Sequence, residues 1–285
     1  MRELILAVNS VALGSLLFLL SSGFSLIFGL MRIPNLTHGS FFMLGAYIGV
    51  SFLRLGLDFW LAALLSGLAM AAIGGLVERF LLRRLAGQAL PQVLLTLGLS
   101  FIIADLCLMI WTGDPISPEA PRALRGTVPI LGIVFPAYRL AVMLIAVVAA
   151  AGLWAMLERT RLGAMIRAGV DDAPIARVMG IRVSRLFTLS FALGAGLAGF
   201  AGMIGGPILS VYPGLDADML PLALIVVILG GTGSLLGAFL GSYLIGFLYN
   251  FGQAFFPELA YIILFLPMLL VLVLRPQGLF GRQVP

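Results

Sequence analysis

Long apolar segments decide what this sequence can fold into. Hydrophobic residues make up 61% of the 285 residues and charged residues only 10%, whereas a soluble domain is about a quarter charged. An α-helix needs roughly 20 mostly apolar residues to cross the hydrocarbon layer of a bilayer. Apolar segments fall near residues 5–30, 39–53, 59–77, 93–111, 138–157, 186–206, 220–250 and 258–274. Lipid is therefore the solvent for most of this chain.

A helical bundle fits these segments better than a β-barrel does. The strands of a barrel alternate apolar and polar residues, but residues 223–229 are apolar at every position. The sequence therefore predicts an all-α, polytopic transmembrane bundle with about eight hydrophobic segments. We expect residues 1–285 to form one transmembrane domain.

The composition also argues against several classes of function. All 17 basic residues are arginine, and the net charge of +5 fits basic cytoplasmic loops. No basic patch is interleaved with aromatic residues, so we expect no nucleic-acid partner. Cys107 lies in an apolar run and His38 is the single histidine; neither supports thiol chemistry or a histidine-based metal site. Residues 231–233 lack the lysine of a phosphate-binding loop. We expect no enzyme activity, metal or cofactor on this chain.

Arginine bias sets the expected orientation, because basic loops stay in the cytoplasm. Three segments hold 11 arginines, so they should face the cytoplasm; these are Arg79, Arg83, Arg84, Arg159, Arg161, Arg167, Arg177, Arg182, Arg185, Arg275 and Arg282. With these three segments in the cytoplasm, the number of membrane crossings between them places the N-terminus outside. The same count requires segment 220–250 to be broken. We predict a half-helix, a glycine turn containing Gly231 and Gly233, and a returning helix. Residues 207–221 are expected to form the preceding loop. Irregular backbone at membrane depth occurs inside protein or beside a cavity, so we expect this turn in the bundle interior.

A second interruption lies between the first two apolar segments. Residues 31–39 contain Asn35, Thr37 and His38, and Ser40 follows at the start of the next segment. These polar side chains could line a transport pathway. Alternatively, they could cap the following helix by bonding its free N–H groups. Paired interruptions are typical of inverted repeats around a central pathway, although the two halves show no residue-level similarity.

Asp105 lies in the middle of an apolar segment. A central carboxylate costs roughly 2.5–3.5 kcal/mol on insertion scales. We therefore expect Asp105 to face the bundle and to have a partner. The partner could make a structural hydrogen bond, or the carboxylate could serve a substrate or proton.

Residues 158–185 form the longest hydrophilic segment. Leu162, Met165 and Ile166 have helical spacing, and Asp171 or Asp172 can cap a second short helix. The apolar face of this second helix would consist of Ile175, Val178 and Met179, and Gly180 is placed to end it. Such a helix could dock into a groove of a partner or lie on the bilayer surface.

Four segments in the same order resemble branched-chain amino acid ABC transporter permeases. These are residues 29–47 (GLMRIPNLTHGSFFMLGAY), 167–181 (RAGVDDAPIARVMGI), 229–234 (LGGTGS) and 275–281 (RPQGLFG). Together they span most of the chain. The family usually has alanine where Thr37 stands, which leaves Asn35 and His38 undisturbed.

The resemblance implies a subunit of an importer in the bacterial inner membrane. Such a permease pairs with a related second permease or with itself, receives substrate from a periplasmic binding protein, and binds two ATPases that hold ATP and Mg²⁺. The resemblance implies an ATPase-coupling segment within 158–185 that contains Arg167, Asp171, Asp172, Ala173, Ala176, Met179 and Gly180. Candidate pathway residues are Asn35, Thr37, His38, Ser40, Asp105, Gly231 and Gly233.

Three alternatives stay open at this point. The substrate could be a branched-chain or similar amino acid, or instead urea or a short amide. The chain could also be a channel or ion-coupled carrier that needs no ATPase. A carrier should show paired charges within the membrane, and only Asp105 is clearly central.

Overall fold

The computed structural model describes residues 2–31, 35–130 and 133–281. The long helices are α1 (Arg2–Met31), α2 (His38–Arg54), α3 (Phe59–Phe80), α4 (Ala89–Trp111), α5 (Ala137–Arg159), α8 (Val183–Leu209), α9 (Leu215–Gly230), α10 (Leu235–Phe255) and α11 (Ala260–Leu274). Two short helices, α6 (Arg161–Asp171) and α7 (Ala173–Val178), connect α5 to α8. Single 3₁₀ turns lie at η1 (Leu82–Leu85), η2 (Arg122–Leu124) and η3 (Pro257–Leu259).

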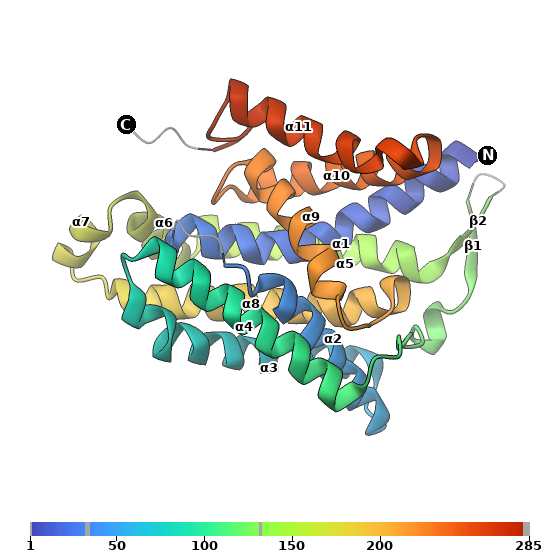
Figure 1. Cartoon of the computed structure of the whole chain (residues 1–285), viewed down its shortest axis with the longest axis horizontal. Helices are drawn as coiled ribbons and strands as arrows, with labels where there is room; N and C mark the ends of the chain where they lie inside the picture. The colour runs from blue at the N-terminus through green and yellow to red at the C-terminus, as the bar shows by residue number, and fades with distance from the viewer. Residues whose placement is uncertain (1, 32–34, 131–132, 282–285) are drawn as a thin grey trace.

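The bundle has two distinct ends along its long axis (Figure 1). One end, which we call the arginine-rich end, carries η1, α6, α7 and the C-terminal segment. The other, the hairpin end, carries the N-terminus and a β-hairpin. The three arginine-rich segments of the sequence therefore gather at one end, as the predicted topology requires.

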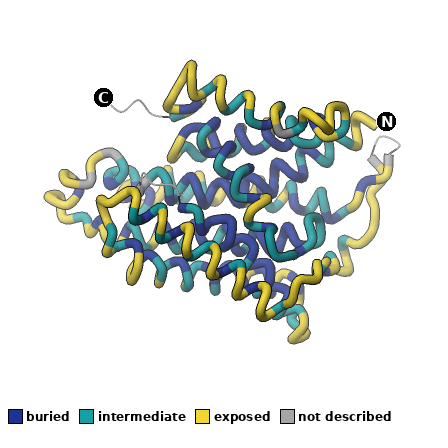
Figure 2. The backbone as a smooth tube through the Cα atoms, viewed as in Figure 1, coloured by how far each residue is buried: buried dark blue, intermediate teal, exposed yellow. Residues whose placement is uncertain are grey.

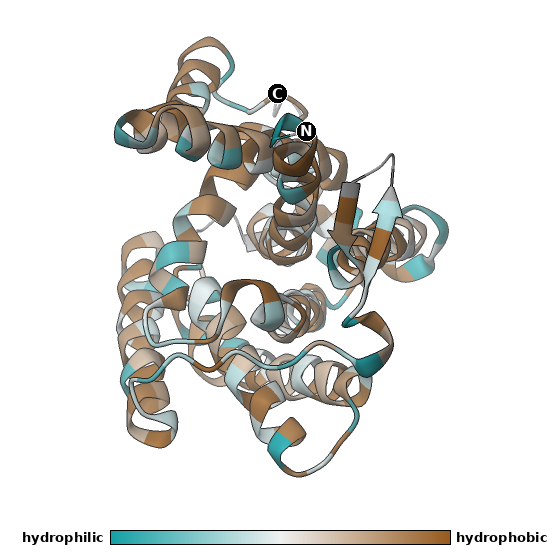
Figure 3. Ribbon diagram, turned by 90° about the vertical axis from the view of Figure 1, so that its right-hand side faces the viewer, coloured by the Kyte–Doolittle hydropathy of each residue, from teal (hydrophilic) through white to brown (hydrophobic). Residues whose placement is uncertain are grey.

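The predicted polytopic helical bundle is confirmed. Seven helices in the described part of the chain are long and apolar enough to cross a membrane. Ribbons of these spans are predominantly hydrophobic over their length (Figure 3). Helices α2 and α9 are the exceptions, with 17 and 16 residues. At 1.5 Å per residue each measures about 25 Å, which is shorter than the hydrocarbon layer of about 30 Å.

Two details of the secondary structure differ from expectation. Strands β1 (Thr127–Ile130) and β2 (Ile133–Pro136) pair antiparallel at the hairpin end, in register Thr127 with Pro136. This ribbon lies in a proline-rich stretch that gave no strand signal. The predicted loop over 207–221 is present but too long: only residues 210–214 are outside the helices, because α8 continues through Pro207 and α9 begins at Leu215 and runs through Pro221.

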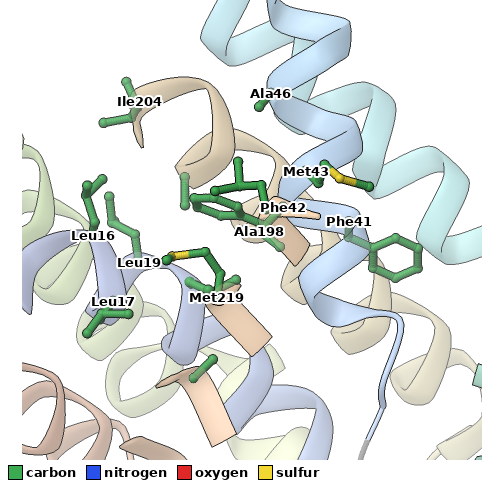
Figure 4. Packing of buried hydrophobic residues seen from close by; sticks show 14 of the residues in the cluster. Leu16, Leu17, Leu19, Phe41, Phe42, Met43, Ala46, Ala198, Ile204 and Met219 are labelled. Atoms are coloured by element: carbon green, nitrogen blue, oxygen red, sulfur yellow. The ribbon is translucent and has the colours of Figure 1, made fainter. Parts of the chain in front are cut away.

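Helices α1 and α8 form the centre of the bundle, and α3, α4, α5 and α11 lie around it (Figure 2). Glycines allow the central helices to approach closely, as is common in membranes. A Cβ on Gly23 would collide with the backbone of Gly194, and one on Gly202 would collide with the carbonyl of Phe42. Figure 4 shows Leu19, Phe42 and Met219 pointing toward one another where α1, α2 and α9 meet.

The helix contacts have an internal symmetry that supports the suspected inverted repeat. Helix α3 packs along α8, as α10 packs along α1; α2 contacts α3 and α4, as α9 contacts α10 and α11. Helices α1, α2, α3 and α4 therefore correspond in their contacts to α8, α9, α10 and α11, in that order. Helix α1 runs toward the arginine-rich end and α8 runs away from it (Figure 1), so the two units have opposite directions.

Candidate transport pathway and coupling surface

Helix α2 begins deep inside the bundle rather than at the end of α1. The His38 imidazole Nε2 lies 2.9 Å from the carbonyl oxygen of Leu20 and the ring stacks on Phe24, with centroids 5.0 Å apart. Leu20 precedes the end of α1 at Met31 by about 17 Å along the axis, at 1.5 Å per residue. The chain therefore re-enters the bundle from the arginine-rich end before α2 starts.

The polar residues ahead of α2 bond to neighbouring helices more than to α2 itself. The Thr37 hydroxyl donates to the Thr96 carbonyl at 3.3 Å, and the Leu36 N–H donates to the Thr96 hydroxyl, also at 3.3 Å. The Asn35 side-chain oxygen accepts the Thr37 N–H at 3.2 Å. The capping interpretation is therefore wrong for Thr37, which makes no side-chain cap, and for His38, which bonds α1. Asn35 lies two residues ahead of the N-cap residue Thr37 and bonds the N–H of that residue, not one within α2.

Helix α9 begins at a similar depth after entering from the hairpin end. Gly202 of α8 lies against Phe42 of α2. Along the helix axis, Gly202 lies about 10 Å before the end of α8 at Leu209. Asp216, in the first turn of α9, accepts a hydrogen bond of 2.9 Å from the Ser40 hydroxyl, in the first turn of α2. Two short helices thus enter from opposite ends and meet at their N-terminal turns.

This meeting point gathers groups suited to polar ligands inside an apolar bundle. Helix N-termini carry partial positive charge, and Asp216 supplies a carboxylate beside both of them. Asn35 and His38 are buried, with exposed fractions of 3% and 0%. Their Nδ2 and Nδ1 atoms have no hydrogen-bond partner among the described residues. We missed Asp216 from the sequence, because a carboxylate in an expected loop gave no reason to place it against Ser40.

Asp105 does not lie where we expected it. Its side chain is exposed on the outer side of α4, and it makes no hydrogen bond or ion pair with any residue that the structure describes. The expectation that it faces the bundle interior is therefore wrong for a single chain. Helix α4 is apolar around nearly its whole circumference, so the sequence could not tell which side packs inward.

Gly231 and Gly233 form the predicted turn between a half-helix and a returning helix. Both have positive φ angles, 97° and 77°, a conformation that glycine adopts without strain. The turn lies at the arginine-rich end, where Gly233 contacts Gly29 near the end of α1. The C-terminal segment covers it, since the Leu279 N–H donates to the Leu229 carbonyl at 2.9 Å. The expected position in the bundle interior is therefore wrong; the interior interruption is the one before α9.

The segment at the arginine-rich end matches the helices predicted for it. The Asp172 carboxylate caps α7 by accepting the Ile175 N–H at 2.9 Å, and Gly180 follows the helix with φ of 82°. Asp171 and Ala173 belong to α6 and α7, but their side chains lie outside the described residues. Arg167 on α6 pairs with Glu158, at 3.4 Å, and also donates to the Leu157 carbonyl.

Helix α7 presents apolar side chains that no described part of the chain covers. Ile175, Val178 and Met179 are 61%, 89% and 76% exposed, whereas Ala176 on the opposite side is buried. Three apolar side chains on one short, capped helix outside the spans form a ready docking surface. We call these three residues the α7 apolar face.

An ion-pair network joins the helix that follows α7 to α3. The Glu78 carboxylate, only 1% exposed, lies 3.0 Å from an Arg83 guanidinium nitrogen and accepts the Thr188 hydroxyl at 2.5 Å. Arg83 also donates to the Ser184 carbonyl at 2.9 Å, near the start of α8. A cavity of about 650 Å³ lies beside this network, between the α3–α4 connection and residues 177–187. The network therefore bridges a loosely packed junction.

Comparison with known proteins identifies relatives along the whole chain. Residues 6–272 match the family described as "Branched-chain amino acid transport system / permease component". The chain is 28% identical to the high-affinity branched-chain amino acid transport system permease protein BraD of Pseudomonas aeruginosa, over 96% of this chain and 94% of that protein. It is 26% identical to LivH of Salmonella typhimurium over the same shares. A shorter match, 33% identical, covers 60% of this chain and 51% of the autoinducer 2 import system permease protein LsrC of Klebsiella pneumoniae. No solved structure matches the chain.

Proposed function

Because the chain belongs to the family of permease components of branched-chain amino acid transport systems, we propose that it forms part of an importer for leucine, isoleucine, valine or similar small amino acids. It is a non-catalytic, multi-pass membrane subunit of an ABC transport system. Two ATPases, which bind ATP and Mg²⁺, supply the energy. A second permease completes the pathway, and a periplasmic binding protein delivers the substrate.

The observation that carries this proposal is the α7 apolar face. A helix of six residues is far too short to be stable alone, so its caps and its contact with α8 must hold it in place. Its apolar side chains nevertheless point away from the chain. An ATPase that receives α7 in a groove can move α8 directly, because only Met179 to Arg182 separate the two helices.

The meeting point of α2 and α9 is the proposed pathway element. Asn35, His38 and Ser40 lie there with Asp216, which joins the pathway set. The zwitterion of an amino acid needs one anionic and one cationic contact, and a carboxylate beside two helix N-termini offers both. Thr37 supports this site by holding the re-entrant segment against α4.

The coupling role is tested by breaking the α7 apolar face without touching the bundle. Val178→Arg should abolish copurification of the ATPase and ATP-dependent uptake of labelled leucine. Leu55→Arg is the matched control, because Leu55 is a similarly exposed aliphatic residue, at 76%, at the opposite end of the molecule. Leucine uptake by vesicles that lack both ATPases would contradict the importer and favour a channel or carrier. Competition by urea or acetamide, in place of isoleucine and valine, would assign the other substrate class.

No observation in the described residues favours the ion-coupled carrier. Such a carrier needs paired charges along its path. Among the described residues, Asp216 bonds the Ser40 hydroxyl and no cation, and Asp105 faces away from the bundle without a partner.

A further inference from the structure

Helix α4 touches its own chain along a narrow stripe. Its buried residues are Gln92, Thr96, Ile103 and Cys107. Leu95, Leu99, Ala104 and Trp111 are partly buried against the core, and the remaining side of the helix leaves a broad exposed surface along its length (Figure 2). We call the outward side that contains Gly98, Ile102, Asp105 and Met109 the α4 outer face.

Asp105 sits on the α4 outer face at membrane depth. It precedes the helix end at Trp111 by about 9 Å, in a helix about 34 Å long, at 1.5 Å per residue. Its neighbours on this face, Ile102 and Met109, are 56% and 80% exposed. Hydrocarbon cannot donate a hydrogen bond to a carboxylate, and an aspartate is too short to reach the headgroups from there. A charge in this place calls for a partner outside the chain.

The other peripheral helices show what a lipid-facing surface of this protein looks like. Between their terminal turns, the exposed side chains described on α3, α5 and α11 are all apolar, as in Leu64, Leu68, Val147, Val148 and Leu269. Only the α4 outer face interrupts this pattern with a charge. The contrast sets α4 apart from the faces that lipid covers.

Gly98 leaves room for a second helix to approach this face, as Gly152 does on α5. Gly98 lies seven residues before Asp105, and therefore on nearly the same side of the helix. A Cβ at Gly98 would meet nothing within 4 Å, so no neighbour in the chain requires a glycine there. Small residues on exposed membrane helices allow a second helix to approach closely. Close approach at Gly98 would bring a donor on that helix within reach of Asp105.

We propose that the α4 outer face binds a transmembrane helix of a second, non-identical permease chain, which places a cation or hydrogen-bond donor against Asp105. This rests on the proposed function, which calls for a second permease. A second copy of this chain fits poorly. Around a two-fold axis through this face, two Asp105 carboxylates would come together, and like charges at close range repel. The outward faces of α3, α5 and α11 would offer a second copy's carboxylate no cation either.

The test uses the whole transporter in native membranes. A photo-crosslinking amino acid is placed at Ile102 or Met109 on α4. Matched positions on other peripheral helices are Val148 on α5 and Val273 on α11, which are 63% and 81% exposed. Mass spectrometry of the adducts should find a related but different permease sequence at the two α4 positions, and no protein at the two controls. Adducts with that permease at the control positions alone, or with lipid alone at all four, would overturn the proposal. An adduct of this chain with a second copy of itself at α4 would overturn the proposal that the partner is a non-identical chain.

Substitution of Asp105 gives an independent readout. Asp105→Leu removes a charge from a lipid-exposed helix, so the chain itself should insert at least as well. Retention of the second permease after detergent extraction should nevertheless fall about tenfold, as expected for losing a charged hydrogen bond. Asp105→Asn keeps an acceptor and should lose less. Unchanged retention in Asp105→Leu contradicts the proposal. Failure of the proposed function would give a different result. Uptake would then occur without the ATPases, while the crosslinks from α4 to the second permease would still form.

Discussion

The Glu78–Arg83 pair offers a sharp test of how the arginine-rich end is held together. Arg83→Gln removes the cation from a carboxylate that is 1% exposed. Removing one partner of a buried pair typically costs 3–5 kcal/mol, because the other charge stays buried. The Arg83 side chain is 37% exposed, so solvent screens part of the interaction and about 2 kcal/mol remains. Thr188 still donates to Glu78 and limits the loss.

The assay is thermal unfolding of the detergent-solubilised chain, with a matched ion pair as control. A loss of about 2 kcal/mol corresponds to a fall in Tm of about 5 °C in a chain of this size. Arg125→Gln breaks the Arg125–Glu119 pair at the other end, whose side chains are 48% and 75% exposed. Exposed pairs contribute under about 1 kcal/mol, so this Tm should fall by about 2 °C or less.

Comparing the Tm of Arg83→Gln with that of Arg125→Gln shows whether burial or the ion-pair distance determines the loss of stability. The control pair is the closer one, at 2.5 Å against 3.0 Å; distance alone therefore predicts the opposite order. The double variant Glu78→Gln with Arg83→Gln should recover about half of the loss, since the buried charge is gone. Equal Tm values for Arg83→Gln and Arg125→Gln would refute the reasoning.

Four further predictions concern other parts of the chain. Gly202→Ala should lower stability by about 1–3 kcal/mol by overpacking the α2–α8 contact, whereas Gly98→Ala should leave the Tm of the isolated chain unchanged, because its Cβ meets nothing. Asp172→Ala removes the α7 cap, worth about 1 kcal/mol, and should weaken ATPase binding measured by titration; Asp172→Ser should restore it. Asp216→Leu should abolish leucine uptake while ATPase copurification persists, and loss of both together would indicate misfolding instead. Gly180→Val should impair ATPase binding about as much as losing the cap, because a β-branched residue is strained at a φ of 82°.

Local rules made the helices and α7 predictable from the sequence. Span positions follow from the length of apolar segments alone, and most helix bounds lie within a few residues of expectation. The cap of α7 needs only Asp172 and the N–H three residues ahead, and its end needs only Gly180. Interactions within one turn of helix can be read without knowing the fold.

The side on which each helix packs, and the contacts between residues distant in the sequence, could not be predicted from the sequence for physical reasons. A helix in lipid can be apolar on every side, so periodicity does not say which side packs inward; Asp105 on α4 is the case in point. The bond between Ser40 and Asp216 joins residues 176 positions apart, and no local signal links them. The hairpin at β1 and β2 depends on pairing that its prolines disguised.

The position of the polar residues follows from where the backbone leaves the helix. A segment that re-enters a bundle exposes N–H and C=O groups without helical partners, and lipid cannot satisfy them. The two re-entrant connections, one before α2 and one before α9, therefore have to lie in protein and find partners there. In the first, the Asn35 Oδ1 accepts the Thr37 N–H and the Thr96 hydroxyl accepts the Leu36 N–H. In the second, Val211 exchanges backbone hydrogen bonds with Ile116. Ser40 and Asp216, in the first turns of the helices that follow, bond each other. Because the two connections enter from opposite ends, their polar groups meet in the middle of the bundle. The turn at Gly231 lies instead at the end of the bundle, where Ser234 caps α10 and the C-terminal segment donates hydrogen bonds to the carbonyls of Leu229 and Gly230.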